Sequence, residues 1–211
     1  MRVLVVMALT LLMSACVPMG QQKPIDQNSE DVFWNTRYPD LLALTDWEIT
    51  GRSVIAQKSE GWNVGLLWQE FDGMFLVKLQ GPFGQGGAVL KGDKDNVVLI
   101  LDDGRRMSSS NAEQLIKEAL GIPLPLNALR DWVRGIPHAG QEFETIQFDQ
   151  RGRIVSLQQQ GWQIDYKRYI PFGDYSMPGK IFIHKGEQRL KIIVSDWEPT
   201  NKEQAIQWMN L

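Results

Sequence analysis

Hydrophobic and polar positions along this chain follow two periods, and each change of period marks a predicted element. Between residues 30 and 45, apolar side chains recur at helical spacing. We expect a helix there that is bent or restarted at Pro39, because proline lacks the N–H group that continues the helical hydrogen-bond ladder. Two alternating segments follow, each with its apolar side chains on one face: Trp62, Val64, Leu66 and Trp68 in the first, and Phe75, Val77 and Leu79 in the second.

Short alternating segments continue on both sides of a second helical region. Residues 71–74 predict a hairpin turn, and a loop rich in proline and glycine is predicted at residues 171–179. The remaining predicted strands lie at 88–91, 96–101, 105–108, 143–150, 154–159, 162–169, 181–184 and 190–195.

Two amphipathic helices are predicted between these groups of strands. Ser110 and Glu113 have the spacing of a capping box at the start of the first helix, and Gly121 ends it. Pro125 suits the first turn of the second helix, which Gly135 closes.

Together these elements indicate one domain that is mainly β with α. Antiparallel strands and amphipathic helices pack most economically as one strongly curved sheet with the helices on its concave side. We therefore predict a single antiparallel half-open β-barrel of about eleven strands, covered by three helices and enclosing an apolar cavity. The predicted domain spans residues 30–198. Residues 199–211 form an extension whose short helix could cover part of the cavity mouth.

The amino terminus has the pattern of a secretory signal. Arg2 supplies the positive charge, and an apolar run too short to span a membrane follows it. Residues 12–16, LMSAC, resemble the lipobox, at which bacterial lipoproteins are cut before a cysteine that carries a lipid. We predict a signal peptide at residues 1–15, lipidation of Cys16 and a polar tether at residues 16–29. The alternative is an incidental thiol in a cleaved signal.

Charge narrows the classes of partner. The chain carries a net charge of −3, and removal of the predicted signal takes away one basic and no acidic side chain, which leaves −4. An acidic surface argues against nucleic acid and against electrostatic binding to anionic membranes. The anchor would therefore be the lipid itself.

No residue pattern points to a catalytic site, a metal site or a cofactor. His138 and His184 have no partner at metal-ligand or triad spacing. Asp102 and Asp103 fall in a predicted hairpin turn, where local backbone hydrogen bonds favour aspartate. The glycine-rich segment at residues 81–87 lacks the Lys-Ser/Thr pair and the following helix of a phosphate-binding loop. We therefore predict that the protein is not an enzyme.

The same glycine-rich segment carries one large apolar side chain, Phe83, between Pro82 and Gly84. Loop tips seldom expose such a side chain, because its burial is worth ~1.5–3 kcal/mol. Either Phe83 folds back onto the core, or it reaches out to a lipid or a partner.

Residues 121–137, GIPLPLNALRDWVRGIP, resemble a segment that joins two helices in the LolB family of outer-membrane lipoprotein receptors. The likeness extends to residues 34–51, the loop at residues 81–84, the first of the two central helices and the pair at residues 196–197. It implies a half-barrel that accepts lipoproteins from the soluble periplasmic carrier LolA and places their acyl chains in the outer membrane. In the family an exposed apolar loop residue assists membrane insertion, and Phe83 occupies that position.

The resemblance also implies partners and a binding site. The partners would be a LolA-like carrier, acylated lipoprotein cargo and the outer membrane of a Gram-negative bacterium. The protein would be a monomer, held by its lipid on the periplasmic side of that membrane. Each candidate for the wall of the acyl cavity could equally belong to a closed core; the candidates are Val64, Leu66, Trp68, Phe75, Val77, Leu79, Leu115, Leu129 and Trp132. The alternative function is a structural or assembly envelope lipoprotein that binds another protein.

Overall fold

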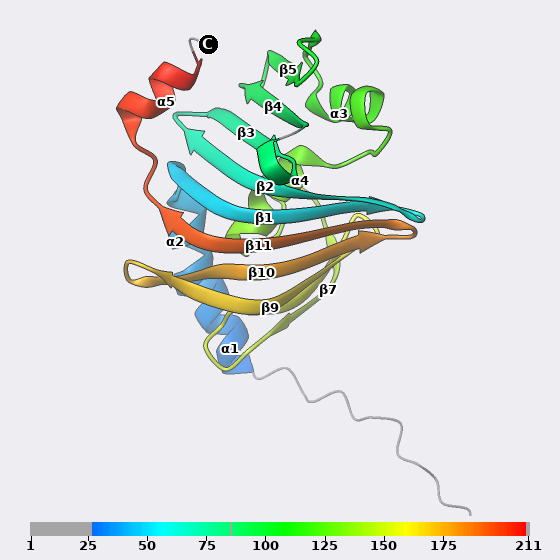
Figure 1. The fold of residues 1–211 in the computed structure, drawn as a ribbon. Coiled ribbons are helices and arrows are strands. Elements are labelled where there is room, and N and C mark those ends of the chain that lie inside the picture. The colour runs from blue at the N-terminus through cyan, green and yellow to red at the C-terminus, as the bar shows by residue number, and fades with distance from the viewer. Residues whose placement is uncertain (1–26, 85, 210–211) are drawn as a thin grey trace, which may run out of the picture.

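The computed structural model describes residues 27–84 and 86–209, and in that part of the chain eleven strands form one antiparallel sheet (Figure 1). The sheet order is β6-β5-β4-β3-β2-β1-β11-β10-β9-β8-β7. The strands are β1 (Trp47–Gln57), β2 (Glu60–Phe71), β3 (Met74–Gln80), β4 (Gly87–Gly92), β5 (Val97–Leu101), β6 (Arg106–Ser109), β7 (Phe143–Phe148), β8 (Ile154–Gln159), β9 (Trp162–Phe172), β10 (Tyr175–Lys185) and β11 (Gln188–Glu198).

Two meanders of consecutive strands meet at the centre of this sheet. Strands β1 to β6 are neighbours in chain order, as are β7 to β11, and the long strands β1 and β11 join the two halves. Strands β6 and β7 lie at opposite ends of the order, so the curved sheet stays open. The predicted half-open antiparallel barrel is thus confirmed.

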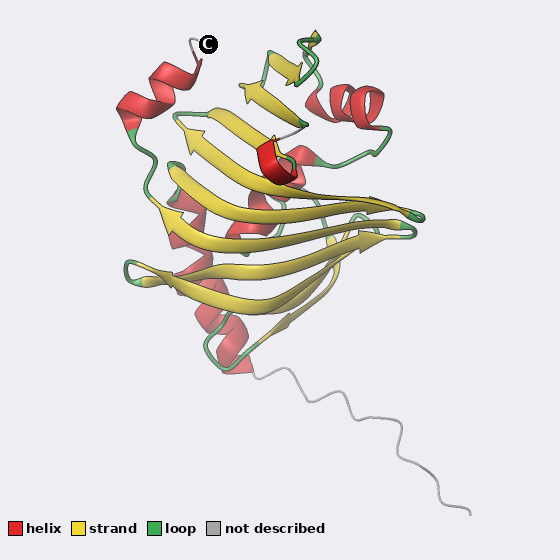
Figure 2. Ribbon diagram, in the orientation of Figure 1, coloured by secondary structure: helices red, strands yellow, loops and turns green. Residues whose placement is uncertain are grey.

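Helices cover the concave side of the sheet (Figure 2). The first helical segment consists of α1 (Gln27–Val32), the π-helical turn η1 (Phe33–Arg37) and α2 (Tyr38–Ala43). The central pair consists of α3 (Ala112–Leu120) and α4 (Leu126–Arg134). Because α1 begins at Gln27, the last three residues of the predicted tether are helical. No helix in the described ranges is long and apolar enough to cross a membrane.

A π-helical turn accommodates Pro39 within the first helical segment. The N–H group of Tyr38 donates to the carbonyl oxygen of Phe33, five residues earlier, and Pro39 then lies in the first turn of α2. Proline is tolerated in a first turn, where its missing N–H group would have no intrahelical partner. The predicted helix is therefore present, and its irregularity takes the form of a wider turn.

Two local predictions were wrong. Asn111, and not Ser110, caps α3, because the Asn111 side chain accepts a hydrogen bond from the backbone N–H group of Gln114. The predicted loop at residues 171–179 is mostly strand, since β9 and β10 continue to a tight turn. Pro178 is compatible with β10 because the pairing register shifts beside it, as in a β-bulge.

The C-terminal helix α5 (Lys202–Met209) lies on the outer face of the sheet. The Lys91 ammonium donates to the carbonyl oxygen of Trp208 at 3.2 Å, and the Lys78 ammonium lies 5.6 Å from the centre of the Trp208 ring. Both lysines alternate with inward-facing residues of β3 and β4. The described part of α5 therefore lies away from the residues that line the cavity mouth.

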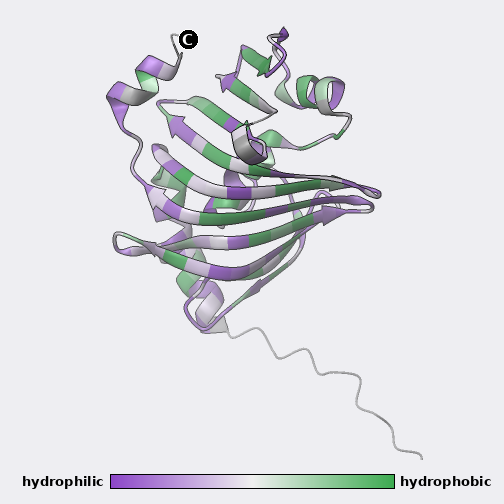
Figure 3. Cartoon of the chain, viewed as in Figure 1, coloured by the Kyte–Doolittle hydropathy of each residue, from purple (hydrophilic) through white to green (hydrophobic). Residues whose placement is uncertain are grey.

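Apolar and polar residues alternate along the strands, which gives the sheet its two faces (Figure 3). In β2, Leu66, Trp68 and Glu70 face the concave side, and the first two contribute to the core. The core also includes the inner residues of α4, among them Leu129 and Val133. Close packing between α4 and the sheet thus defines the interior in which a cavity remains.

Candidate apolar binding cavity

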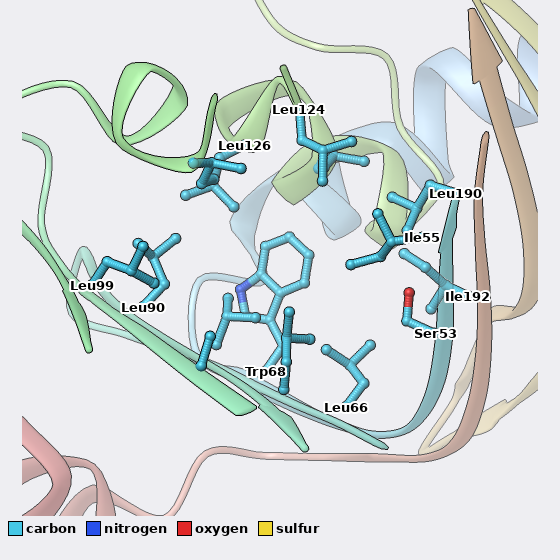
Figure 4. A pocket seen from close by; sticks show the side chains of 15 residues that line it. Ser53, Ile55, Leu66, Trp68, Leu90, Leu99, Leu124, Leu126, Leu190 and Ile192 are labelled. Carbon is cyan, nitrogen blue, oxygen red and sulfur yellow. The ribbon is translucent and has the colours of Figure 1, made fainter. Parts of the chain in front are cut away.

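A cavity of about 80 Å³ lies between the sheet and the central helices. Fifteen residues line it, and Ser53 is the one polar side chain among them. Figure 4 shows the indole of Trp68 rising from the sheet towards Leu124, in the segment that leads into α4, and Leu126, the first residue of α4. Apart from the Ser53 hydroxyl, such a lining offers no hydrogen bonds that would orient a polar ligand, so it suits a hydrocarbon chain.

A wider opening of about 620 Å³ adjoins the cavity. Ile55, Leu79 and Ala88 line both spaces, so the opening is the mouth of the cavity. Trp62 and Pro82 lie on the rim of the mouth. Asn63, Asp102 and Arg105 also line the mouth, but most of the side chains along the route from the surface to the interior are apolar.

The structure brings together most of the residues predicted for the cavity wall. Leu66, Trp68, Val77, Leu79 and Leu129 line the cavity. The predicted residues of β2 and β3 share one face of the sheet, because in the pairing of these strands Trp68 lies opposite Val77 and Leu66 lies opposite Leu79.

Four predicted residues lie elsewhere. Val64 lines the mouth, and Leu115 is buried in the core outside both spaces. Phe75 packs under the Arg130 guanidinium, whose carbon lies 5.5 Å from the ring centre. Trp132 is buried against the other half of the sheet, where its indole N–H group donates to the side-chain oxygen of Gln159 at 2.9 Å. Periodicity marks the buried face but does not separate a cavity wall from closed packing.

Sequence reasoning missed ten of the lining residues. The signal for several of them was alternation in β1, β4, β5 and β11, but only the register of the sheet places these strands around one space. The missed residues are Ser53, Ile55, Ala88, Leu90, Leu99, Ile116, Leu124, Leu126, Leu190 and Ile192.

A buried ion pair connects α4 to the sheet at the end of the cavity. The Arg130 guanidinium donates to one carboxylate oxygen of Glu70, and the Trp68 indole N–H group donates to the other at 2.9 Å. Burial raises the pKa of Glu70 above its ordinary value of 4.5, although the charge and hydrogen bond of Arg130 act in the opposite direction. This arrangement holds the cavity-wall indole of Trp68 and the helix α4 together.

A second polar cluster fixes the far side of α4. The Asp131 carboxylate pairs with the Arg134 guanidinium and lies 2.6 Å from the Nδ1 atom of His138. Arg134 also donates to the carbonyl oxygens of Leu41 and Leu44, at 3.1 and 2.9 Å. These carbonyl groups belong to the end of α2, so the cluster joins the first helical segment to α4.

The predicted membrane loop forms the turn η2 (Pro82–Gly84) between β3 and β4. Pro82 and Gly84 are exposed. The N–H group of Gly81 donates to the carbonyl oxygen of Gly86 at 2.8 Å, which closes the loop. The side chain of Phe83 lies outside what the structure describes, as do Cys16 and the predicted signal.

Acidic and metal-binding side chains do not converge elsewhere in the described ranges. No group of three or more His, Cys, Asp or Glu side chains there has an arrangement that could hold a metal ion. Asp103, in the turn between β5 and β6, accepts hydrogen bonds from the backbone and side chain of Arg105, and these lower its pKa. The aspartate thus has the local turn role predicted for this pair.

Comparisons with known proteins agree with this architecture. Residues 45–197 match the family described as "Outer membrane lipoprotein LolB". A relative from Nitrosococcus oceani, named "Outer-membrane lipoprotein LolB", is 31% identical over 93% of this chain and 97% of its own length. A Pseudomonas aeruginosa protein of the same name is 30% identical over 89% of this chain and 91% of its own length.

A solved structure supports the fold alone. A DUF1329 family protein from Desulfovibrio piger matches with a TM-score of 0.52 and 6% identity, over 85% of this chain and 94% of that chain. The family match covers nearly all strands of the sheet together with both helices of the central pair. The chain therefore belongs to the LolB family of outer-membrane lipoproteins.

Proposed function

We propose that this protein is a receptor anchored in the outer membrane, which accepts lipoproteins from a LolA-like periplasmic carrier and inserts their acyl chains into that membrane. The observation that carries the proposal is the apolar cavity, with a mouth beside an exposed loop. The family membership supports the coarser role of an outer-membrane factor in lipoprotein localisation.

The hydrophobic effect supplies the reason for such a receptor. Each acyl methylene exposed to water costs about 0.8 kcal/mol, so acylated cargo needs a covered route across an aqueous compartment. No nucleotide-binding motif is present in the sequence. Transfer would therefore run downhill, from a weaker apolar site in the carrier to this cavity and then to the bilayer.

The inner cavity alone is too small for the proposed cargo. Pockets for small ligands usually measure about 300–1,000 Å³, whereas this one measures about 80 Å³. Passage of an acyl chain from the mouth into this inner space therefore requires the space to enlarge, and we infer that α3 and α4 move away from the sheet. The cavity wall is aliphatic apart from Trp68 and Ser53, and its side chains can repack around a flexible chain.

Two parts of the protein would contact the membrane: the lipid on Cys16 and the loop that carries Phe83. A lipid on Cys16 would hold the receptor on the periplasmic side of the outer membrane, with residues 17–26 as the tether. The exposed turn at Pro82 and Gly84 would present Phe83 to the bilayer when cargo is released. The receptor would act as a monomer, because one sheet and its helices supply both the cavity and the loop.

A two-step transfer assay tests the proposal. The lipidated full-length protein would be reconstituted in liposomes and mixed with carrier loaded with acylated cargo. We expect cargo to leave the carrier and then to resist extraction from the liposomes. Ala88→Phe, at the junction of mouth and cavity, should fold but accept little cargo. If the folded wild-type protein takes no cargo, the receptor proposal is wrong and the structural or assembly role is favoured.

A further inference from the structure

Trp62 is an unusually exposed tryptophan at the start of β2. It is 46% exposed, whereas Trp68 on the same strand is 3% exposed. Seven of the eight tryptophans contact another aromatic ring or a cation in the described part of the chain, and Trp62 does neither. Packing within the protein therefore does not explain why this position holds an indole.

Position 62 lies at the outer end of an apolar row along β2. Trp62 lies opposite Ile55 of β1, on the face that also carries Leu66 and Trp68. Residues on one face of a strand recur about every 7 Å, so the row from Trp62 to Trp68 is about 20 Å long. Trp62 and Val64 line the mouth, while Leu66 and Trp68 line the cavity. The row thus crosses the boundary between surface and interior.

We propose that Trp62 is the residue of the receptor that first binds an acyl chain of the cargo, and that the chain then moves along the β2 row into the cavity. This inference rests on the receptor function proposed above. It adds a site at the mouth whose ligand is a saturated hydrocarbon chain. The indole offers a broad apolar surface with few rotatable bonds, so it can hold a flexible chain at a small entropic cost.

The position of Trp62 favours cargo over bilayer lipid as its ligand. Trp62 shares the lining of the mouth with Ile55, Leu79 and Ile122. These side chains come from β1, β3 and the segment after α3, so the opening that Trp62 lines is bounded by several elements of the fold. A chain that contacts Trp62 is therefore already within the mouth.

Photo-crosslinking identifies the ligand directly. Benzoylphenylalanine would replace Trp62 in the lipidated full-length protein, which would be reconstituted in liposomes. The phospholipid of the liposomes would carry one radiolabel, and the acyl chains of the cargo would carry another. We expect the crosslinked protein to carry the cargo label during transfer. Benzoylphenylalanine at Phe143, an exposed aromatic position on β7, is the control and should not capture cargo. Capture of phospholipid in place of cargo would overturn the proposal in favour of a membrane contact.

The rate of acceptance provides an independent measurement. Trp62→Ala should slow the initial transfer of cargo from carrier to receptor by roughly tenfold, which corresponds to ~1.4 kcal/mol of lost contact, while Phe143→Ala should leave it unchanged. The amount of cargo bound at equilibrium should change less than the rate, because the cavity wall is intact. If wild-type receptor accepts cargo and Trp62→Ala accepts it equally fast, the Trp62 site is wrong. If the wild type accepts none, the receptor function itself fails.

Discussion

Glu70 occupies a position where one residue controls both the cavity wall and the helix above it. Its carboxylate accepts hydrogen bonds from the Trp68 indole and the Arg130 guanidinium, and its side chain is only 4% exposed. A charge buried to this degree depends on its partner, because removal of one member of a buried pair leaves the other uncompensated. The pair is therefore a sensitive point in the attachment of α4.

Arg130→Met should lower the free energy of unfolding by about 3 kcal/mol, because it leaves the buried carboxylate of Glu70 without its partner. This value is at the lower end of the range for a broken buried pair, since the Arg130 side chain is itself a quarter exposed. Chemical denaturation at neutral pH would measure the change. Glu70→Gln keeps an acceptor for Trp68 without a charge, so the double variant should recover most of the loss. A double variant as unstable as Arg130→Met alone would contradict this explanation.

The same variants should respond to pH in a defined direction. Burial raises the folded-state pKa of Glu70 above 4.5, so its stabilising contribution is fully present below that value and is lost as pH rises through the folded pKa. Arg130→Met removes a positive charge that lowers this pKa. The destabilisation by Arg130→Met should thus be largest at neutral pH and should shrink as the carboxyl group becomes protonated. Denaturation curves of the wild type and Arg130→Met across the acidic range would measure this pH dependence. In the Glu70→Gln background, the effect of Arg130→Met should no longer depend on pH.

Substitution of Phe83 should affect the release of cargo into the membrane without affecting the acceptance of cargo from the carrier. Phe83→Glu should leave the uptake of cargo from the carrier unchanged and should reduce its insertion into liposomes at least tenfold, because a charged tip disfavours entry into a bilayer. Phe83→Leu, which keeps an apolar tip, is the matched control and should insert cargo normally. Equal insertion by the wild type and Phe83→Glu would show that the loop has no such role.

At the scale of elements, sequence patterns located the helices and ten of the eleven strands, but they missed the central strand β1, although one of its faces is buried. The alternation in β2 and β3 and the glycines that end α3 and α4 are local signals that tertiary structure preserves. The segment at residues 171–179 was mistaken for a loop because proline and glycine weaken the strand pattern. The register shift in β10 that accommodates Pro178 depends on pairing with β9, which periodicity alone does not reveal.

Helix α5 offers a test of which face of the sheet carries the function. It packs on the outer face, near Lys78 and Lys91, so deletion of residues 201–211 should leave binding of a fluorescent fatty acid within about twofold. The free energy of unfolding should fall by ~1–2 kcal/mol, because the deletion exposes apolar surface that α5 covers. Probe titration and denaturation of the same preparation would measure both quantities. Loss of probe binding would place α5 in the binding site.

The central helices should respond to ligand as a unit. Since the inner cavity measures about 80 Å³, we expect an acyl chain bound within it to displace α3 and α4. Hydrogen exchange should therefore change in α3 and α4 on saturation with palmitate, while β1 and β11, which have strand neighbours on both sides, keep their protection. An unchanged exchange pattern in α3 and α4 would contradict movement of these helices.

At the scale of the whole molecule, the fold was more predictable than the site. Antiparallel order follows from short connections, and a curved sheet under amphipathic helices follows from one-sided burial. Cavity walls depend on small mismatches between facing side chains, which no one-dimensional pattern contains. Leu129 and Trp132 illustrate this, because both were predicted from one helix face, and only the first lines the cavity.

One measurement tests the central claim, that acyl chains occupy the cavity beneath α3 and α4, most directly. Cargo whose acyl chains carry a diazirine would be transferred to the receptor, photolysed, and mapped by mass spectrometry. We predict labels on lining residues from several elements, among them Leu66 of β2, Leu90 of β4 and Leu129 of α4. Labels confined to the outer face of the sheet, such as Lys78 or Trp208, would contradict the account.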